Sequence, residues 1–207
     1  MINMAISEEL VLDLYRVGAI KFGKFRLTSG IESPIYVDLR ITITYPSIYR
    51  QLVKAMSELL SNYEFDVVAG IETAGIPWAS MIAYELGKGL IYVRKEAKGH
   101  GTARLIEGDL RKGTRVFLID DVITTGGSII RAINALREQG GDVVGVAVFV
   151  DREQGGIDVI RREGINATAL MKLSFIMNIL LSRGVVDRAL YDEVMRYLVS
   201  VRVPQND

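Results

Sequence analysis

A series of short apolar runs, separated by stretches with helical periodicity, constrains the fold of this chain more than any other feature. The runs are rich in valine, isoleucine and leucine and are bounded by glycine or polar residues, as is typical of strands buried on both faces. We expect such strands at Val67–Ala69, Leu90–Val93, Val116–Ile119, Val143–Val150 and Ala167–Leu170. Because strands alternate with helices, the sequence predicts an α/β fold with a parallel sheet covered by helices on both faces.

Helices are expected wherever apolar residues recur with the period of an α-helix. Ser7 can cap the first of them, which we expect to extend to about Ala19. The others are expected at Tyr45–Asn62, Ile76–Leu86, Ser128 to about Gln139, Ile157–Arg162, Phe175–Leu181 and Val186–Val199.

The N-terminal part of the chain departs from this alternation. Phe22–Leu27 and Ile35–Leu39 are typical of short strands, and Ser29–Gly30 and Ser33–Pro34 are typical of turns. We expect residues 1–62 to form a small subdomain over the functional site, and residues 63–207 to form the α/β core and the C-terminal helices. No linker divides the chain, so both parts are expected to belong to a single domain, residues 1–207.

Composition argues against several classes of function. Hydrophobic residues make up 49% of the chain, which is enough for a sizeable core. The 25 lysines and arginines balance the 25 aspartates and glutamates, so there is no electrostatic case for nucleic acid as the main partner. Because cysteine is absent, the chain has neither a disulfide framework nor a thiol nucleophile.

Membrane and secretion signals are also not evident in the sequence. The N-terminus lacks a basic start followed by an apolar core, so we expect no signal peptide. The most apolar stretch near the C-terminus, Phe175–Leu181, is too short to span a bilayer. We therefore expect a cytoplasmic protein without a membrane partner.

The run V-F-L-I-D-D-V-I-T-T-G-G-S, Val116–Ser128, carries the clearest chemistry. It puts Asp120, Asp121 and a polar, glycine-rich loop at the carboxyl end of an expected strand, where open α/β sheets bind ligands. Glycines before a helix N-terminus let backbone amides approach a phosphate. Adjacent carboxylates suit a ligand that brings hydroxyl donors or Mg²⁺, so a sugar phosphate fits both halves. The alternative is an ordinary strand–turn–helix whose acids are solvated.

This run resembles the phosphoribosyl pyrophosphate signature of the type I phosphoribosyltransferases. The resemblance implies a Rossmann-like parallel sheet core with a small N-terminal subdomain, the hood, which carries base recognition. It implies that Asp120 and Asp121 contact the ribose hydroxyls. It also implies that the following loop holds the 5′-phosphate, through Thr124, Thr125, Gly126, Gly127 and Ser128, and that Val122 and Ile123 belong to the substrate-binding run.

A second motif, R-K-E-A-K-G-H-G, follows the expected strand Leu90–Val93. Lysines and arginines outnumber acids in this part of the chain, and such a charge excess would suit a diphosphate leaving group. The alternative is a solvated charged loop, the commoner fate of such runs. The motif resembles the catalytic loop of orotate phosphoribosyltransferases, at Arg94, Lys95, Lys98 and His100. In that family the loop closes over the active site of the neighbouring subunit of a dimer.

Three further segments extend the resemblance. The turn Gly70–Pro77 resembles the family's pyrophosphate-binding turn, with Ala74 where some members carry lysine. The segment around Tyr36 resembles the hood motif beside the orotate ring, with Thr28 where other members carry lysine. Arg152, at the end of the strand Val143–Val150, matches the residue that binds the orotate carboxylate. From the residues alone, a βα turn, a strand pair and a surface ion pair are the alternatives.

The resemblance implies the transfer of phosphoribose from phosphoribosyl pyrophosphate to orotate, giving orotidine 5′-monophosphate and pyrophosphate. The expected catalytic residues are Lys95, Lys98, His100 and Asp121, with Mg²⁺ held mainly by substrate oxygens. We expect a homodimer that binds these small molecules and no nucleic acid. Two alternatives stay open: transfer to another base, such as a purine, and a non-enzymatic regulator that senses phosphoribosyl pyrophosphate.

Overall fold

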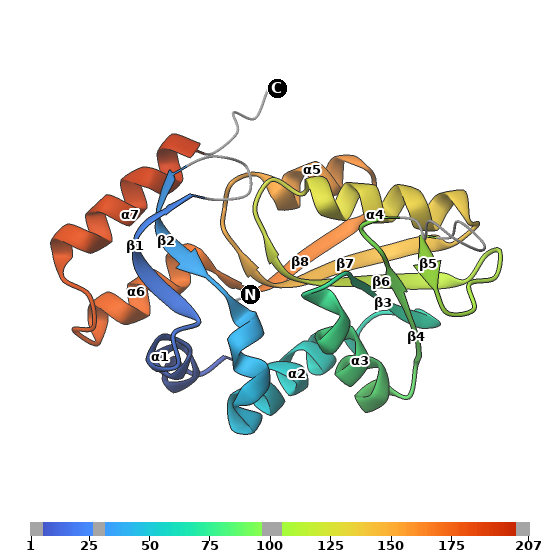
Figure 1. Cartoon of the computed structure of the whole chain (residues 1–207), viewed down its shortest axis with the longest axis horizontal. Helices are drawn as coiled ribbons and strands as arrows, with labels where there is room; N and C mark the ends of the chain where they lie inside the picture. Colours follow the sequence, from blue (N-terminus) through green and yellow to red (C-terminus); the bar gives the residue numbers. More distant parts are fainter. Residues whose placement is uncertain (1–5, 27–31, 97–104, 202–207) are drawn as a thin grey trace.

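A six-stranded sheet forms the centre of the computed structural model, which describes residues 6–26, 32–96 and 105–201 (Figure 1). In spatial order its strands are β5 (Ile106–Glu107), β4 (Gly89–Val93), β3 (Val67–Ile71), β6 (Arg115–Ile123), β7 (Asp142–Asp151) and β8 (Asn166–Lys172). All neighbouring strands are parallel except β4 and β5. The predicted α/β fold with a parallel sheet is confirmed.

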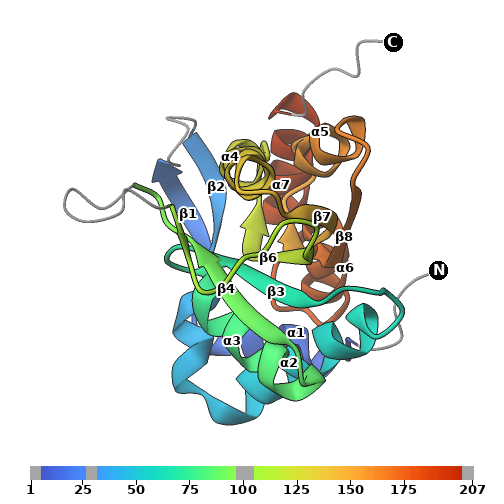
Figure 2. The same ribbon diagram turned by 90° about the vertical axis from the view of Figure 1, so that its right-hand side faces the viewer.

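Helices cover both faces of this sheet (Figures 1 and 2). One face carries α2 (Pro46–Leu60) and α3 (Gly75–Leu86), and the other carries α4 (Gly127–Glu138) and α5 (Gly156–Arg162). Successive side chains of β6 alternate between the two faces, so Phe117 joins one hydrophobic cluster and Leu118 the other. This double burial explains why the strands read as continuous apolar runs.

The N-terminal elements gather at one end of the sheet together with the last two helices (Figure 1). They comprise α1 (Glu8–Arg16), β1 (Ile20–Arg26), β2 (Glu32–Val37) and a 3₁₀ helix, η1 (Leu39–Thr44), and they lie near α6 (Leu173–Ser182) and α7 (Arg188–Val201). The strands β1 and β2 form an antiparallel pair. Buried side chains of α1, β2 and α6 share one cluster with Trp78 and Phe149 of the core.

Several boundaries near the N-terminus differ from the prediction. Ser33 and Pro34 lie within β2 rather than in a turn, because proline is tolerated in a two-stranded sheet where every strand is an edge. The strand ends at Val37, and Leu39 begins η1 because the Asp38 carboxylate accepts the N–H of Arg40 (3.1 Å) and caps the turn.

Two other elements also differ from the sequence-based expectation. Helix α1 ends at Arg16 rather than near Ala19, since Gly18 adopts a left-handed φ of 78° that stops the helix. The short strand β5 is not among the expected strands, and it pairs antiparallel with β4. It has two residues, too few for a periodic signal. Among the described residues, no helix is long and apolar enough to cross a membrane.

The register of β6 against β7 depends on a glycine opposite an aromatic ring. Phe117 pairs directly with Gly145, and the Phe117 ring packs against Tyr63 and Phe65 at centroid distances of 5.1 and 5.3 Å. A Cβ at Gly145 would lie 2.7 Å from Cζ of Phe117 and closer still to Cε2. The ring therefore occupies the space that a side chain at Gly145 would need.

We predict that Gly145→Ala destabilises the fold by about 1–3 kcal/mol, the usual cost of overpacking a core. For a chain of this length each kcal/mol lowers Tm by about 2–4 °C, which a thermal melt measures. Adding Phe117→Leu to Gly145→Ala should recover part of the loss, because the smaller side chain vacates the clashing space. The account would be contradicted if the double variant lost as much Tm as the two single variants lose together, or more.

Candidate active site

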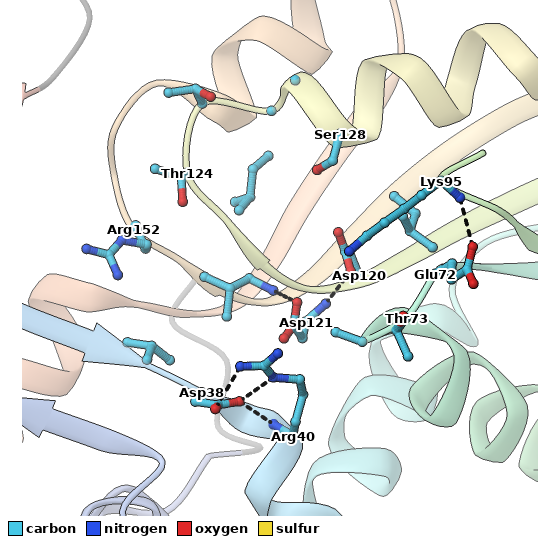
Figure 3. A pocket seen from close by; sticks show the side chains of 18 of the residues that line it. Asp38, Arg40, Glu72, Thr73, Lys95, Asp120, Asp121, Thr124, Ser128 and Arg152 are labelled. Carbon is cyan, nitrogen blue, oxygen red and sulfur yellow. Dashed lines mark hydrogen bonds and ion pairs between the residues drawn. The ribbon is translucent and has the colours of Figure 1, made fainter. Parts of the chain in front are cut away.

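A cavity of about 610 Å³ opens at the carboxyl ends of β3, β6 and β7, next to the end of β2 (Figure 3). Five parts of the chain meet there: the end of β2 with η1, the β3–α3 turn, Lys95 after β4, the β6–α4 loop with α4, and the end of β7. Its walls are formed by Tyr36, Val37, Asp38, Arg40, residues 71–74, Lys95, residues 120–128, Arg131 and Arg152.

Two adjacent carboxylates occupy the centre of this cavity. Asp120 is only 7% exposed, and its Oδ1 accepts the N–H of Asp121 at 3.0 Å. The Asp121 carboxylate in turn accepts the N–H of Val122 at 2.8 Å. Burial, and next the charge of Asp121, raise the pKa of Asp120 well above its ordinary value, and burial also raises the pKa of Asp121. The pair is therefore costly to ionise until a ligand supplies donors or positive charge.

The loop after the acids has the geometry of an anion site. Gly126 has a left-handed φ of 84°, and a Cβ there would lie 3.1 Å from the carbonyl oxygen of Gly156, so both conformation and space favour glycine. Helix α4 begins at Gly127, where first-turn amides have no partner within the helix. The hydroxyls of Thr124 and Ser128 point into the cavity beside these amides (Figure 3).

The next connection along the sheet braces this loop. The N–H of Gly156 donates to the carbonyl of Thr124, and the N–H of Arg152 donates to the carbonyl of Ile123, both at 3.0 Å. These bonds tie the loop to the end of β7, so its shape is set by the core rather than by the loop alone.

The β3–α3 turn approaches the acid pair closely. A Cβ at Gly75 would lie 2.7 Å from the carbonyl oxygen of Ile119 and 3.3 Å from Oδ1 of Asp120, so only glycine leaves room there. Within the turn, the peptide bond between Glu72 and Thr73 is cis. The Glu72 carboxylate accepts the backbone N–H of Lys95 at 2.9 Å.

Among the described residues of the second motif, Lys95 reaches the cavity. Its side chain is directed toward Asp120 (Figure 3), and its charge partly offsets the rise in the pKa of that carboxyl. The bond from its backbone to Glu72 anchors the start of the segment on the neighbouring turn. An ammonium group is thus held beside the acid pair.

The N-terminal elements α1, β1, β2 and η1, called the hood below, contribute an aromatic ring and an arginine paired with an aspartate. Tyr36 stacks on Phe25 with a centroid distance of 5.4 Å and an interplanar angle of 28°. Arg40 holds Asp38 through two bonds, Nε to Oδ1 at 2.6 Å and Nη2 to Oδ2 at 2.8 Å. The hydrogen bond from Arg40 lowers the pKa of Asp38, so this carboxyl stays ionised.

Arg152 joins the hood to the core. It is 3% exposed, and its Nη2 donates to Oγ of Ser33 at 3.0 Å and to the carbonyl oxygen of Ile35 at 3.3 Å. Burial lowers the pKa of Arg152, an effect that the nearby Tyr197 of α7 opposes. Its Nε is buried without a hydrogen-bond partner among the residues that the structure describes. A buried donor of this kind calls for an acceptor from a ligand.

The structure brings most of the expected site residues together. Tyr36, Lys95, residues 120–128 and Arg152 all line the cavity. Arg94 does not: it forms an ion pair with Glu107 at 3.3 Å, on the strand beside it. Lys98, His100 and Thr28 lie outside the described residues, and so their predicted roles stay untested.

Sequence reasoning missed four charged residues of the wall: Asp38, Arg40, Glu72 and Arg131. The spacing of Asp38 and Arg40, directly after an expected strand, is a signal that could have identified that pair. Glu72 lies inside a turn that was already expected to bind pyrophosphate. Arg131 carries no sequence signal beyond its position one turn into a helix that follows the phosphate loop.

Comparison with known proteins extends the likeness beyond the motifs. Residues 43–163 match the phosphoribosyl transferase domain family. Orotate phosphoribosyltransferase from Pyrobaculum islandicum is 45% identical over 187 residues, which is 90% of this chain and 96% of that protein. The crystal structure of orotate phosphoribosyltransferase from Aeropyrum pernix superposes with a TM-score of 0.76 at 38% identity, over 86% of this chain and 99% of that one.

A longer protein is also similar in structure. UMP synthase from Leishmania donovani matches with a TM-score of 0.86 and 36% identity. The match covers 94% of this chain but only 42% of that one, so this chain spans less than half its length. Because the curated likeness extends over almost the whole chain, hood and core alike, the chain belongs to the orotate phosphoribosyltransferase family.

Proposed function

We propose that the protein transfers the phosphoribosyl group of 5-phosphoribosyl 1-pyrophosphate to orotate, giving orotidine 5′-monophosphate and pyrophosphate in the de novo synthesis of UMP. The observation that carries the proposal is the union, in one cavity, of a sugar-phosphate half and a half suited to an anionic base. The names of the relatives support the same reaction.

The sugar-phosphate half consists of the acid pair and the loop after it. Ribose hydroxyls can donate to Asp120 and Asp121, whose carboxylates accept the backbone N–H groups of Asp121 and Val122. The amides at the start of α4, with Thr124 and Ser128, can donate to the 5′-phosphate. These contacts would fix the anomeric carbon in the middle of the cavity.

The base half is centred on Arg152 and Tyr36. A guanidinium that is almost completely buried, with Nε unpaired among the described residues, suits a carboxylate because arginine can present parallel donors to both oxygens. Orotate carries a carboxylate and purines do not, so this feature favours orotate over a purine. The stacked Tyr36 offers an aromatic surface for the ring.

The transfer itself is a displacement at the anomeric carbon with an oxocarbenium-like transition state. Negative charge grows on the departing pyrophosphate, and the ammonium of Lys95 lies where it can stabilise that charge. Lys98 and His100 are proposed to act with it, and Asp121 to hold the ribose and offset positive charge on its ring. Orotate needs no general base if its ring nitrogen enters already deprotonated.

Magnesium fits the residues present as a companion of the substrate. Among residues 6–26, 32–96 and 105–201 no group of three or more acids and histidines could hold a metal ion. Asp120 and Asp121 provide oxygen ligands of the kind that Mg²⁺ uses, with substrate oxygens completing its shell. The ion would neutralise charge on the pyrophosphate.

Three further expectations complete the proposal. We propose a single domain, supported by the shared cluster of hood and core residues, and a homodimer with the basic loop shared across the interface. Tyr84 of α3 is 82% exposed beside the partly exposed Met81, which supports an interface at this helix. The cytoplasmic location stays a prediction.

The proposed reaction is tested by an assay of the purified protein with phosphoribosyl pyrophosphate, Mg²⁺ and a panel of bases. Orotate should be consumed and form orotidine 5′-monophosphate, whereas uracil, adenine, guanine and hypoxanthine should not react. Asp120→Asn, purified in the same way, should be inactive, which excludes an enzyme carried over from the expression host. Turnover of a purine but not orotate would support the alternative base, and no turnover with any base would contradict the enzyme.

The same Asp120→Asn variant should be more stable than the wild type in the absence of ligand. Folding raises the pKa of Asp120, so the folded protein is fully stable only while this carboxyl is protonated. Part of that stability is lost as pH rises through the raised pKa and the carboxyl ionises. The asparagine cannot ionise, and its Oδ1 can still accept the N–H of Asp121. The gain should be largest at alkaline pH, with Tm rising about 2–4 °C per kcal/mol relieved.

Thermal melts of both proteins from mildly acidic to alkaline pH measure this gain. The difference in Tm should shrink as pH falls and the wild-type carboxyl becomes protonated. A constant difference across pH, or a less stable variant, would contradict a desolvated carboxylate at this position.

A further inference from the structure

Arg40 lies in the cavity wall, yet the proposed reaction gives it no role. Asp38 fixes the guanidinium by the two-bond fork, and its carboxylate also accepts the backbone N–H of Arg40 at 3.1 Å. The side chain of Arg40 is nevertheless 55% exposed. An exposed arginine is solvated by water and needs no such set of bonds for that purpose. The three bonds to the Asp38 carboxylate instead hold the guanidinium in one orientation.

That orientation places Arg40 between the two halves of the site. Its Nη2 also donates to the hydroxyl of Tyr36 at 3.2 Å, at the edge of the proposed base platform. The guanidinium extends from Asp38 toward Asp121 (Figure 3), and its charge partly offsets the rise in the pKa that burial causes in that carboxyl. Arg40 therefore borders the place where base and ribose would be joined.

One donor group of Arg40 is uncommitted. Nε and Nη2 hold Asp38 and Tyr36, whereas Nη1 has no partner among the residues that the structure describes. The positive charge of Arg40 is already balanced by Asp38. A guanidinium whose charge is balanced, and whose Nη1 keeps both N–H groups free of partners among the described residues, suits a neutral carbonyl oxygen better than a phosphate, because a carbonyl oxygen needs a donor but no net charge.

We propose that Arg40 is a further substrate-binding residue that selects the base, its Nη1–H donating to the C2 carbonyl oxygen of orotate. The inference rests on the proposed function. The reacting ring nitrogen of orotate is flanked by two groups, the C2 carbonyl and the carboxylate. Arg152 is assigned to the carboxylate, and Arg40, which faces Asp121 from the hood, meets the other flank.

Steady-state kinetics of the full chain test this assignment. Arg40→Ala should lower kcat/KM for orotate by about 10- to 100-fold, the usual value of a hydrogen bond to a charged group, and change KM for phosphoribosyl pyrophosphate little. The matched control is Arg16→Ala: Arg16 is 56% exposed, is ion-paired with Glu9 and Asp13, and lies on α1 away from the cavity. It should behave as the wild type.

A substrate analogue separates contact with the base from a purely structural role. Replacing the C2 oxygen of orotate by sulfur weakens the acceptor, so the wild type should use 2-thioorotate less well than orotate. Arg40→Ala should lose this discrimination, because the donor that reads the oxygen is gone. Arg40→Lys keeps the charge without the fork and should lose it too, which covers the case in which the alanine variant fails to fold.

Discrimination equal to that of the wild type in a folded Arg40 variant would overturn the proposal. A loss confined to KM for phosphoribosyl pyrophosphate would also overturn it, since the residue would then serve the sugar half. Failure of the proposed function is a separate result, seen as absence of orotate turnover by the wild type itself.

Discussion

The desolvated carboxylate pair at the end of β6 is the constraint on which the rest of the site depends. Burial makes both carboxylates reluctant to ionise, and in the described structure Lys95 and Arg40 offset this only from a distance. The chain nevertheless builds tightly around them, with Gly75 leaving room for the neighbouring turn. Such an arrangement costs stability in the free protein and is useful only with a ligand that donates hydrogen bonds to the pair.

A second constraint is the attachment of the hood to this centre. Arg152 follows β7 of the core, and its Nη2 donates to Ser33 and Ile35 of β2, so one buried guanidinium links the two parts. Helix α7 adds Tyr197, whose hydroxyl oxygen accepts a hydrogen bond from Nε2 of Gln154 at 3.2 Å and which lies near Arg152. The C-terminal helix thus supports the base side of the cavity although it lines none of it.

Much of this could be predicted from the sequence because the signals are local. Buried parallel strands read as apolar runs, and the acids and glycines after Val116–Ile119 fall at a strand end by simple chain order. The strand continues through Ile123, so the acids belong to the sheet rather than to the loop. This continuation explains their burial.

Other features depend on contacts between distant segments and could not be predicted in this way. Pro34 can lie in β2 because β2 pairs only with β1, so both strands are edge strands. Arg94 pairs with Glu107, which lies on a strand too short to recognise in the sequence. Arg40 gains its place only when Asp38, Tyr36 and Asp121 are brought together. Resemblance to the family identified Arg152, whereas its bonds to Ser33 and Ile35 required the fold.

The most direct test of the central claim is a crystal structure of the protein with phosphoribosyl pyrophosphate bound. The account predicts ribose hydroxyl oxygens within hydrogen-bond distance, about 2.5–3.0 Å, of the carboxylates of Asp120 and Asp121. It predicts the 5′-phosphate on the amides of residues 124–128. A complex in which the 5′-phosphate occupies the β3–α3 turn, or in which both carboxylates contact only solvent, would contradict it.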